Sequence, residues 1–170
     1  MGSRYFEYLK KSITLHGKHI FLTVKEFYQE LNADEQIVQI KHINILIDPY
    51  SYVHILFRHY SKNIKKHQSD KSYHFDHNID FKNIPLILND ILNCYKNEID
   101  HSHFNEQNIY VKINDTIYAI WFKKIIKNIK GGTKLEFLRA QTFYPVEAQY
   151  EMEKIKNMSI QKTSKYDFFL

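Results

Sequence analysis

Residues 48–66, DPYSYVHILFRHYSKNIKK, carry two histidines and an arginine at spacings that suit acid–base chemistry. His54 and Arg58 are four residues apart, so on a helix they lie one turn from each other along one edge. His59 points toward the other edge of the same helix. An imidazole titrates near neutral pH, and a guanidinium binds phosphoryl oxygens through paired hydrogen bonds. This combination predicts acid–base chemistry on a phosphate.

A second set of candidate side chains lies in LEFLRAQTFYPV, residues 135–146. Its arginine and its threonine and tyrosine hydroxyls could donate to phosphoryl oxygens. RNA cleavage without a metal needs a base for the ribose 2′-hydroxyl proton, cations around the phosphorane, and an acid for the leaving 5′-oxygen. The expected product is a 2′,3′-cyclic phosphate. The candidate catalytic residues are His54, Arg58, His59, Arg139, Thr142 and Tyr144.

Aromatic and basic side chains between residues 116 and 125 predict a surface for single-stranded RNA. Bases stack on aromatic rings, and phosphates pair with cations. Tyr118 and Trp121 fall on opposite faces of one predicted strand, with two lysines directly after them. The predicted RNA-binding residues are Tyr118, Trp121, Lys123 and Lys124.

The overall charge favours an anionic partner. The 170 residues carry a formal net charge of +5 and ten histidines, with a sequence pI near 9.1. Such a balance attracts nucleic acid or an anionic membrane surface. No stretch approaches the roughly 20 apolar residues that span a bilayer, so we predict RNA as the partner, with tRNA one candidate, and no membrane. Cys94, the single cysteine, excludes an internal disulfide and fits a reducing, cytoplasmic setting.

Histidines in predicted loops are the other chemical option. His74 and His77, and likewise His101 and His103, lie in polar stretches, and zinc accepts imidazole ligands. Neither pair follows a recognised ligand spacing such as His-Glu-x-x-His, and the four glycines form no phosphate-binding loop. We therefore predict neither a metal nor a cofactor.

The elements that position these side chains begin with helices. Helical spacing, Gly17 as a stop and a capping box predict a helix over 4–15, a short strand over 19–23 and a helix over 23–31. A strand over 36–47 then leads into the helix that Asp48 caps and Pro49 starts. The apolar face that we expect this helix to bury consists of Val53, Leu56, Phe57, Tyr60 and Ile64.

An antiparallel meander follows in the second half of the chain. After a helix over 84–95, strands over 108–113 and 116–125 are joined by the two-residue turn Asn114-Asp115. Alternation along the last strand, residues 135–143, puts Arg139 and Gln141 on one face and Thr142 on the other. The chain therefore predicts a single α+β domain over residues 1–170. We divide it into N-terminal helices over 4–35, a core over about 36–150, and a C-terminal helix and tail over 146–170.

Two segments together resemble phage-associated nucleases of the barnase–EndoU–colicin–RelE superfamily. They are INILIDPYSYVHILFRHY and the late LEFLRAQTFYPV, in which Thr142-Phe143-Tyr144-Pro145 is similar to the family's late Thr-x-Tyr-Pro-like strand. The resemblance covers about residues 36–150. It implies N-terminal helices packed on a small twisted antiparallel sheet, with a histidine-bearing helix.

Members of that superfamily are generally metal-independent ribonucleases, often toxins in phage, interbacterial or toxin–antitoxin conflict. The resemblance therefore implies a hydrolase acting on RNA, opposed by a protein antitoxin or immunity partner. It implies catalytic roles for His54 or His59 and for Arg58, Thr142 and Tyr144. Two alternatives from other classes stay open, namely a non-catalytic RNA- or protein-binding module such as an antitoxin or adaptor, and a purely structural partner protein.

Overall fold

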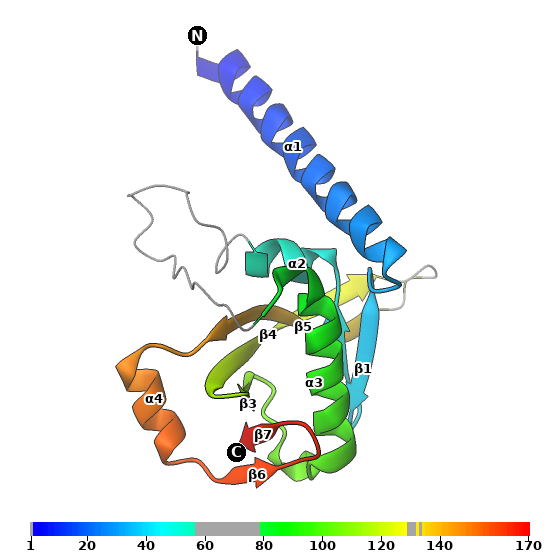
Figure 1. Cartoon of the computed structure of the whole chain (residues 1–170). Helices are drawn as coiled ribbons and strands as arrows, with labels where there is room; N and C mark the ends of the chain where they lie inside the picture. Colours follow the sequence, from blue (N-terminus) through cyan, green and yellow to red (C-terminus); the bar gives the residue numbers. More distant parts are fainter. Residues whose placement is uncertain (1, 57–78, 129–131, 133) are drawn as a thin grey trace.

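A seven-stranded sheet with helices packed against it makes up the body of the computed structural model, which describes residues 2–56, 79–128, 132 and 134–170. Its strands lie in the order β1-β2-β5-β4-β3-β7-β6 (Figure 1). The predicted α+β class is confirmed. The sheet is larger than the small antiparallel sheet that we expected, and it is mixed, because β2 (Ile43–Ile47) runs parallel to β5 (Lys134–Pro145).

The predicted strand over residues 36–47 is two strands. β1 (Gln36–Ile40) and β2 form an antiparallel hairpin, in which Ile40 pairs with Ile43. Lys41 adopts a φ of 54°, in the left-handed region, and so reverses the chain within two residues. The expectation of one continuous strand was wrong. The run of Ile and Val continues on both sides of the turn, and only the two polar residues Lys41 and His42 indicate it.

The N-terminal segment is one long helix, α1 (Gly2–Glu30), where we expected a helix, a strand and a second helix. Gly17 does not end the helix, and it is not among the described glycines with positive φ. An interior glycine costs a helix only about 1 kcal/mol relative to alanine. Most of α1 extends away from the sheet (Figure 1). No helix in the described part of the chain combines the length and the apolar character that a bilayer crossing requires.

The predicted start of the central helix is confirmed. Asp48 accepts a hydrogen bond from the Ser51 backbone N–H at 3.0 Å, and Ser51 Oγ accepts one from the Asp48 N–H, which completes a capping box. The helix α2 (Pro49–Ile55) buries Tyr52 and Ile55 fully. Of our expected buried face, Leu56 packs against the main core, whereas Val53 is only half-buried, and the face centres instead on Tyr52 and Ile55. Phe57, Tyr60 and Ile64 lie outside the described residues.

The main core lies between the sheet and α3 (Ile84–Glu98), whose predicted position is confirmed. A short hairpin of β6 (Ile160–Lys162) and β7 (Asp167–Phe169) extends the sheet beside β3 (Asn108–Ile113), where we expected an irregular tail. Two carboxylates of α3 hold this hairpin. Asp90 accepts from the Tyr166 hydroxyl at 2.6 Å, and Glu98 accepts from the Ser164 N–H at 2.7 Å.

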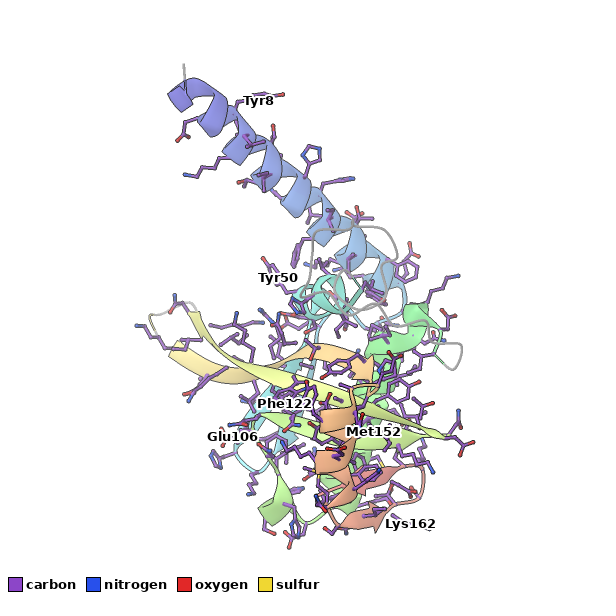
Figure 2. The ribbon with its side chains drawn as sticks, turned by 90° about the vertical axis from the view of Figure 1, so that its left-hand side faces the viewer. Tyr8, Tyr50, Glu106, Phe122, Met152 and Lys162 are labelled. Atoms are coloured by element: carbon purple, nitrogen blue, oxygen red, sulfur yellow. The ribbon has the colours of Figure 1, made fainter. Side chains whose placement is uncertain are left out.

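The second face of the sheet is covered at one end by α4 (Gln149–Lys156). Ile155 and Met152 of this helix pack on Ala119 and Tyr110 in a smaller apolar cluster. Figure 2 shows Met152 on α4 in front of the strands. This second face, rather than the main core, carries most of the polar side chains that the sequence singled out.

Candidate functional site

A β-bulge decides which side chains of β5 share a face. Along β4 (Thr116–Asn128), Lys123 pairs with Arg139 and Trp121 with Thr142, so β5 holds one extra residue between these pairs. Paired residues project to the same side of a sheet. Arg139 and Thr142 therefore share one face, and their partners Lys123 and Trp121 lie beside them on β4. The expected alternation, which separated Arg139 from Thr142, was wrong because a bulge shifts the period by one residue.

Arg139 is held by neighbours from the start of α2. Its Nη2 donates to Asp48 Oδ2 at 2.9 Å, and its guanidinium lies 5.0 Å from the centre of the Tyr50 ring. Tyr50 in turn contacts Phe21 of α1, with ring centroids 4.5 Å apart. Asp48 is almost fully buried, so the ion pair lies in a medium where charges interact strongly. The guanidinium is therefore fixed before any substrate arrives.

The described part of α2 contains one predicted catalytic residue, His54. His54 follows Tyr50 by four residues, so the two side chains lie on the same side of the helix, one turn apart. Tyr50, which lies against Arg139, is thus one turn before His54. His54 is half-buried, and it already has an interaction with the protein. Arg58 and His59 lie outside the described residues.

Three buried donor atoms on this face lack a hydrogen-bond partner among the described residues. They are Arg139 Nε, Thr142 Oγ1 and Asn108 Nδ2. Asn108 pairs with Trp121, which pairs with Thr142, so these three residues form a row across β3, β4 and β5. With strands about 4.8 Å apart, the row spans about 10 Å. A buried donor without a partner costs about 1–3 kcal/mol, so the fold keeps polar groups here that packing does not need.

A buried carboxylate, Glu151 of α4, lies over the neighbouring row, in which Tyr110 and Tyr144 both pair with Ala119. It accepts from the Tyr110 hydroxyl at 2.9 Å and from the Tyr144 hydroxyl at 3.2 Å. Tyr144 accepts from the indole Nε1 of Trp121 at 3.1 Å. Burial, followed by the Glu151 charge, raises the pKa of Tyr144 to about 12, and burial together with Glu151 also raises the pKa of Tyr110. Both phenols therefore stay protonated and position Glu151 and Trp121.

Sequence reasoning missed Glu151, Asp48 as an ion-pair partner, and Asn108. Glu151 precedes the buried Ile155 by one helical turn, and a carboxylate at that position of an amphipathic helix is a detectable signal. The local pattern marks Asp48 as a helix cap alone. Nothing in the local pattern marks Asn108, because its neighbours in the row are distant in the sequence.

The four predicted RNA-binding residues do not form one surface. Tyr118 is completely buried and stacks on Phe143, so its predicted role as a platform for bases was wrong. Lys124 projects to the face opposite Lys123 and forms an ion pair with Glu136. Trp121 and Lys123 remain together, on the face of Arg139 and Thr142.

The described residues contain no group of three or more His, Cys, Asp or Glu side chains that could hold a metal ion. Of the loop histidines, His101 and His103 are described; His101 Nε2 lies 2.7 Å from the Lys96 carbonyl oxygen, and His103 is exposed. His74 and His77 lie outside the described residues.

Comparisons with protein-family models, with curated proteins and with solved structures find no match. The resemblance to barnase–EndoU–colicin–RelE nucleases therefore rests on the residues quoted for it.

Proposed function

We propose that this protein is a metal-independent endoribonuclease that acts on RNA through the ribose 2′-hydroxyl. One observation carries the proposal. The bulge in β5 gathers Arg139 and Thr142 on a single face with Trp121, and Arg139 contacts Tyr50, which lies one turn before His54 in α2. A small α+β nuclease of the barnase–EndoU–colicin–RelE type, serving as a toxin or phage-conflict effector with a protein antitoxin or immunity partner, is the setting that the resemblance implies.

In the proposed reaction, histidine transfers protons, and hydrogen-bond donors on the sheet stabilise the reacting phosphate. A histidine, His54 or His59, takes the proton of the 2′-hydroxyl while that oxygen attacks phosphorus. The bond from phosphorus to the 5′-oxygen breaks, and a second acid returns a proton to the leaving oxygen. The products are a 2′,3′-cyclic phosphate and a free 5′-hydroxyl, so neither a metal nor an oxidant is consumed.

Arg139 and Thr142 are proposed to stabilise the charge that develops on the phosphorane. The Asp48 carboxylate and the Tyr50 ring hold the guanidinium in place, which spares reorganisation during the reaction. Arg139 Nε and Thr142 Oγ1 are donors without described partners, which suits them to phosphoryl oxygens. Because both atoms are buried, the substrate must displace neighbouring side chains to reach them.

Trp121 and Lys123 are proposed to hold the RNA strand. The indole is fixed by its hydrogen bond to Tyr144, and Lys123 is exposed next to Arg139 on the same face. An indole that stacks on a base and a lysine that pairs with a phosphate bind RNA with little sequence preference. Tyr144 then acts as a positioning residue, because its hydroxyl already donates to Glu151.

The test is single-turnover cleavage of end-labelled RNA in excess EDTA, with a binding titration on the same variants. We expect fragments that end in 2′,3′-cyclic phosphate. His54→Ala should lower the rate about 10²–10⁴-fold with little change in affinity. Thr142→Val, which keeps the shape of the side chain, should also lower the rate. His42→Ala removes an exposed histidine that lies with Lys124 and Glu136, on the opposite face, and should cut at the wild-type rate.

Two results would contradict the proposal. Activity that disappears in EDTA and returns with zinc would assign the chemistry to a metal. Wild-type rates in both His54→Ala and His59→Ala would remove the acid–base role of histidine.

One observation favours a second candidate, a non-catalytic RNA-binding module on the same scaffold. Arg139 Nη2 and the Tyr144 hydroxyl are both engaged within the protein, so these groups could serve structure alone. This candidate predicts salt-sensitive binding of RNA that stays intact in the cleavage assay.

A further inference from the structure

Most of α1 stands clear of the protein body and exposes large apolar side chains. Its described contacts with α2 lie in its C-terminal third, where Phe21 meets Tyr50 and Tyr28 meets Tyr52. Before that third, Tyr8 is 70% exposed and Ile13 is 64% exposed. Figures 1 and 2 both show this part of the helix projecting away from the sheet. The exposed large apolar residues here are Tyr8, Leu9, Ile13, Leu15 and Ile20, and Leu22 follows at the start of the C-terminal third.

These residues gather on one half of the helix. At 100° per residue, they form two stripes, one of Tyr8, Leu15 and Leu22 and one of Leu9, Ile13 and Ile20, whose centres are about 140° apart. The sector of about 180° that spans both stripes is called the apolar half, and neutral polar residues occupy its middle. Between residues 8 and 23 this half contains no Lys, Arg, Asp or Glu. Its other members are the neutral polar residues Ser12, His16, His19 and Thr23.

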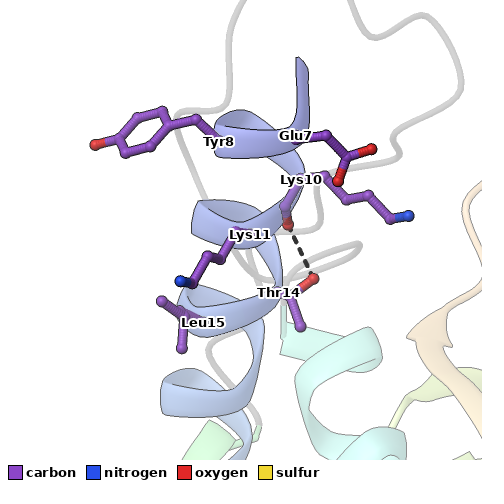
Figure 3. Close-up of a pocket in the computed structure, with 6 residues that line it drawn as sticks. All are labelled: Glu7, Tyr8, Lys10, Lys11, Thr14 and Leu15. Atoms are coloured by element: carbon purple, nitrogen blue, oxygen red, sulfur yellow. Dashed lines mark hydrogen bonds between the residues drawn. The ribbon is translucent and has the colours of Figure 1, made fainter. Parts of the chain in front are cut away.

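The lysines of α1 occupy the opposite half. Lys10, Lys11 and Lys18 lie there, and no acidic residue occurs between Glu7 and Glu26. Figure 3 shows Tyr8 and Leu15 projecting from the same side of the helix, with Lys11 beside them at the border of the apolar half. Lys10 points to the other side. A lysine at a border can rest its carbon chain on an apolar surface while its charge reaches a polar one.

We propose that α1 docks through its apolar half onto an anionic phospholipid surface, lying parallel to it. A helix that has its large apolar side chains and uncharged polar residues on one half, and its lysines on the other, has the properties of an interfacial helix. The lysines complement the negative headgroups. This inference does not depend on the proposed ribonuclease activity. It revises our prediction of no membrane partner, which considered only segments long and apolar enough to span a bilayer.

Two other occupants fit the helix less well. A nucleic acid would neutralise the lysines but leave the apolar half in water. A second copy packed as a coiled coil would use Ile13, Ile20 and Phe27, which repeat every seven residues. The alternate seam positions would then hold Leu9, His16 and Thr23, so two of the three are polar.

The test is flotation of the full chain with vesicles of phosphatidylcholine alone or with added phosphatidylserine. We expect binding at least about tenfold tighter to the anionic vesicles, because each lysine near such a surface adds to the affinity. Binding should weaken as salt rises.

A matched pair of variants distinguishes insertion of the apolar side chains into the bilayer from attraction between the lysines and the anionic headgroups. Ile13→Glu and Thr14→Glu add the same negative charge one residue apart, the first in the apolar half and the second among the lysines. Ile13→Glu should weaken vesicle binding at least about tenfold more than Thr14→Glu. Both positions are exposed, so equal melting temperatures should confirm that both variants fold.

Three outcomes would overturn the proposal. The chain could fail to bind anionic vesicles, or it could bind neutral and anionic vesicles equally. Equal losses in the two variants would show attraction by charge without insertion. A dimer that Ile13→Glu dissociates, in a chain that binds no vesicles, would assign the apolar half to a second copy.

Discussion

Arg139 Nη2 donates to Asp48 Oδ2 at 2.9 Å and thereby joins the middle of β5 to the N-terminus of α2. The same carboxylate accepts from the Ser51 N–H and so caps the helix. One buried side chain thus fixes both the start of α2 and the guanidinium on the sheet. Because the two residues are 91 positions apart, this contact ties the two segments that carry the candidate chemistry.

Replacing Arg139 with methionine should destabilise the fold strongly. The variant leaves the Asp48 carboxylate buried without its cation, and breaking a buried pair in this way costs about 3–5 kcal/mol. Urea denaturation measures the free energy of unfolding. The double variant Asp48→Asn with Arg139→Met keeps a capping oxygen and should recover part of the loss. A single variant that loses less than about 1 kcal/mol would show that the pair is not buried in solution.

Two glutamates of α4, Glu151 and Glu153, allow the same substitution to be compared at a buried and at an exposed position. Glu151 is buried and accepts from two tyrosine hydroxyls, whereas Glu153 is exposed. Glu151→Gln places amide hydrogens against hydroxyl donors, so it should cost about 1–3 kcal/mol. Glu153→Gln should stay within about 0.5 kcal/mol of the wild type. Equal unfolding free energies in the two variants would contradict the network.

The stability of the fold should fall in alkaline solution. Burial raises the pKa of Tyr144 from 10.0 to about 12, and it also raises those of Tyr28 and Tyr95 to about 12. The folded state therefore holds these protons more tightly than the unfolded state does. The resulting stability is fully present below pH 10 and is lost as the pH rises toward 12.

Melting temperatures across that range, with tyrosinate absorbance recorded in parallel, measure this effect. Tyr144→Phe should make the decline shallower, because one of the raised groups is gone. Tyr8→Phe removes a tyrosine that is 70% exposed and should leave the slope unchanged. Identical slopes in all three proteins would refute the assignment of this linkage to Tyr144.

Adjacent lysines on β4 test which face binds RNA. Lys123 shares the face of Arg139, while Lys124 lies on the other face and pairs with Glu136. Lys123→Ala should weaken RNA binding and lower its salt slope by about 1, while Lys124→Ala should change neither. Fluorescence anisotropy at several salt concentrations gives both quantities. The reverse ranking of the two variants would move the interface to the opposite face.

The sequence predicted correctly those elements whose determining residues lie within a few positions of the element itself. Asp48, Pro49 and Ser51 lie within four residues, so the cap and the helix start could be predicted directly. The turn at Asn114 and Asp115 was predictable in the same way, and Asn114 adopts the left-handed φ of 54° that such turns require. Helical periodicity placed α3, because a single packed face needs apolar residues at regular spacing.

By itself, the sequence determined the α+β class, the local elements with strong caps and turns, and the kinds of side chain available for chemistry. The tertiary structure decided which of these side chains meet. Two features brought them together: the parallel pairing of β2 with β5 and the bulge near Gln141. Both depend on pairing between strands that meet only in the folded sheet. No local pattern encodes them, because their energy comes from partners that neighbour one another only in the folded chain. The grouping of Arg139, Thr142 and Trp121 follows from these contacts.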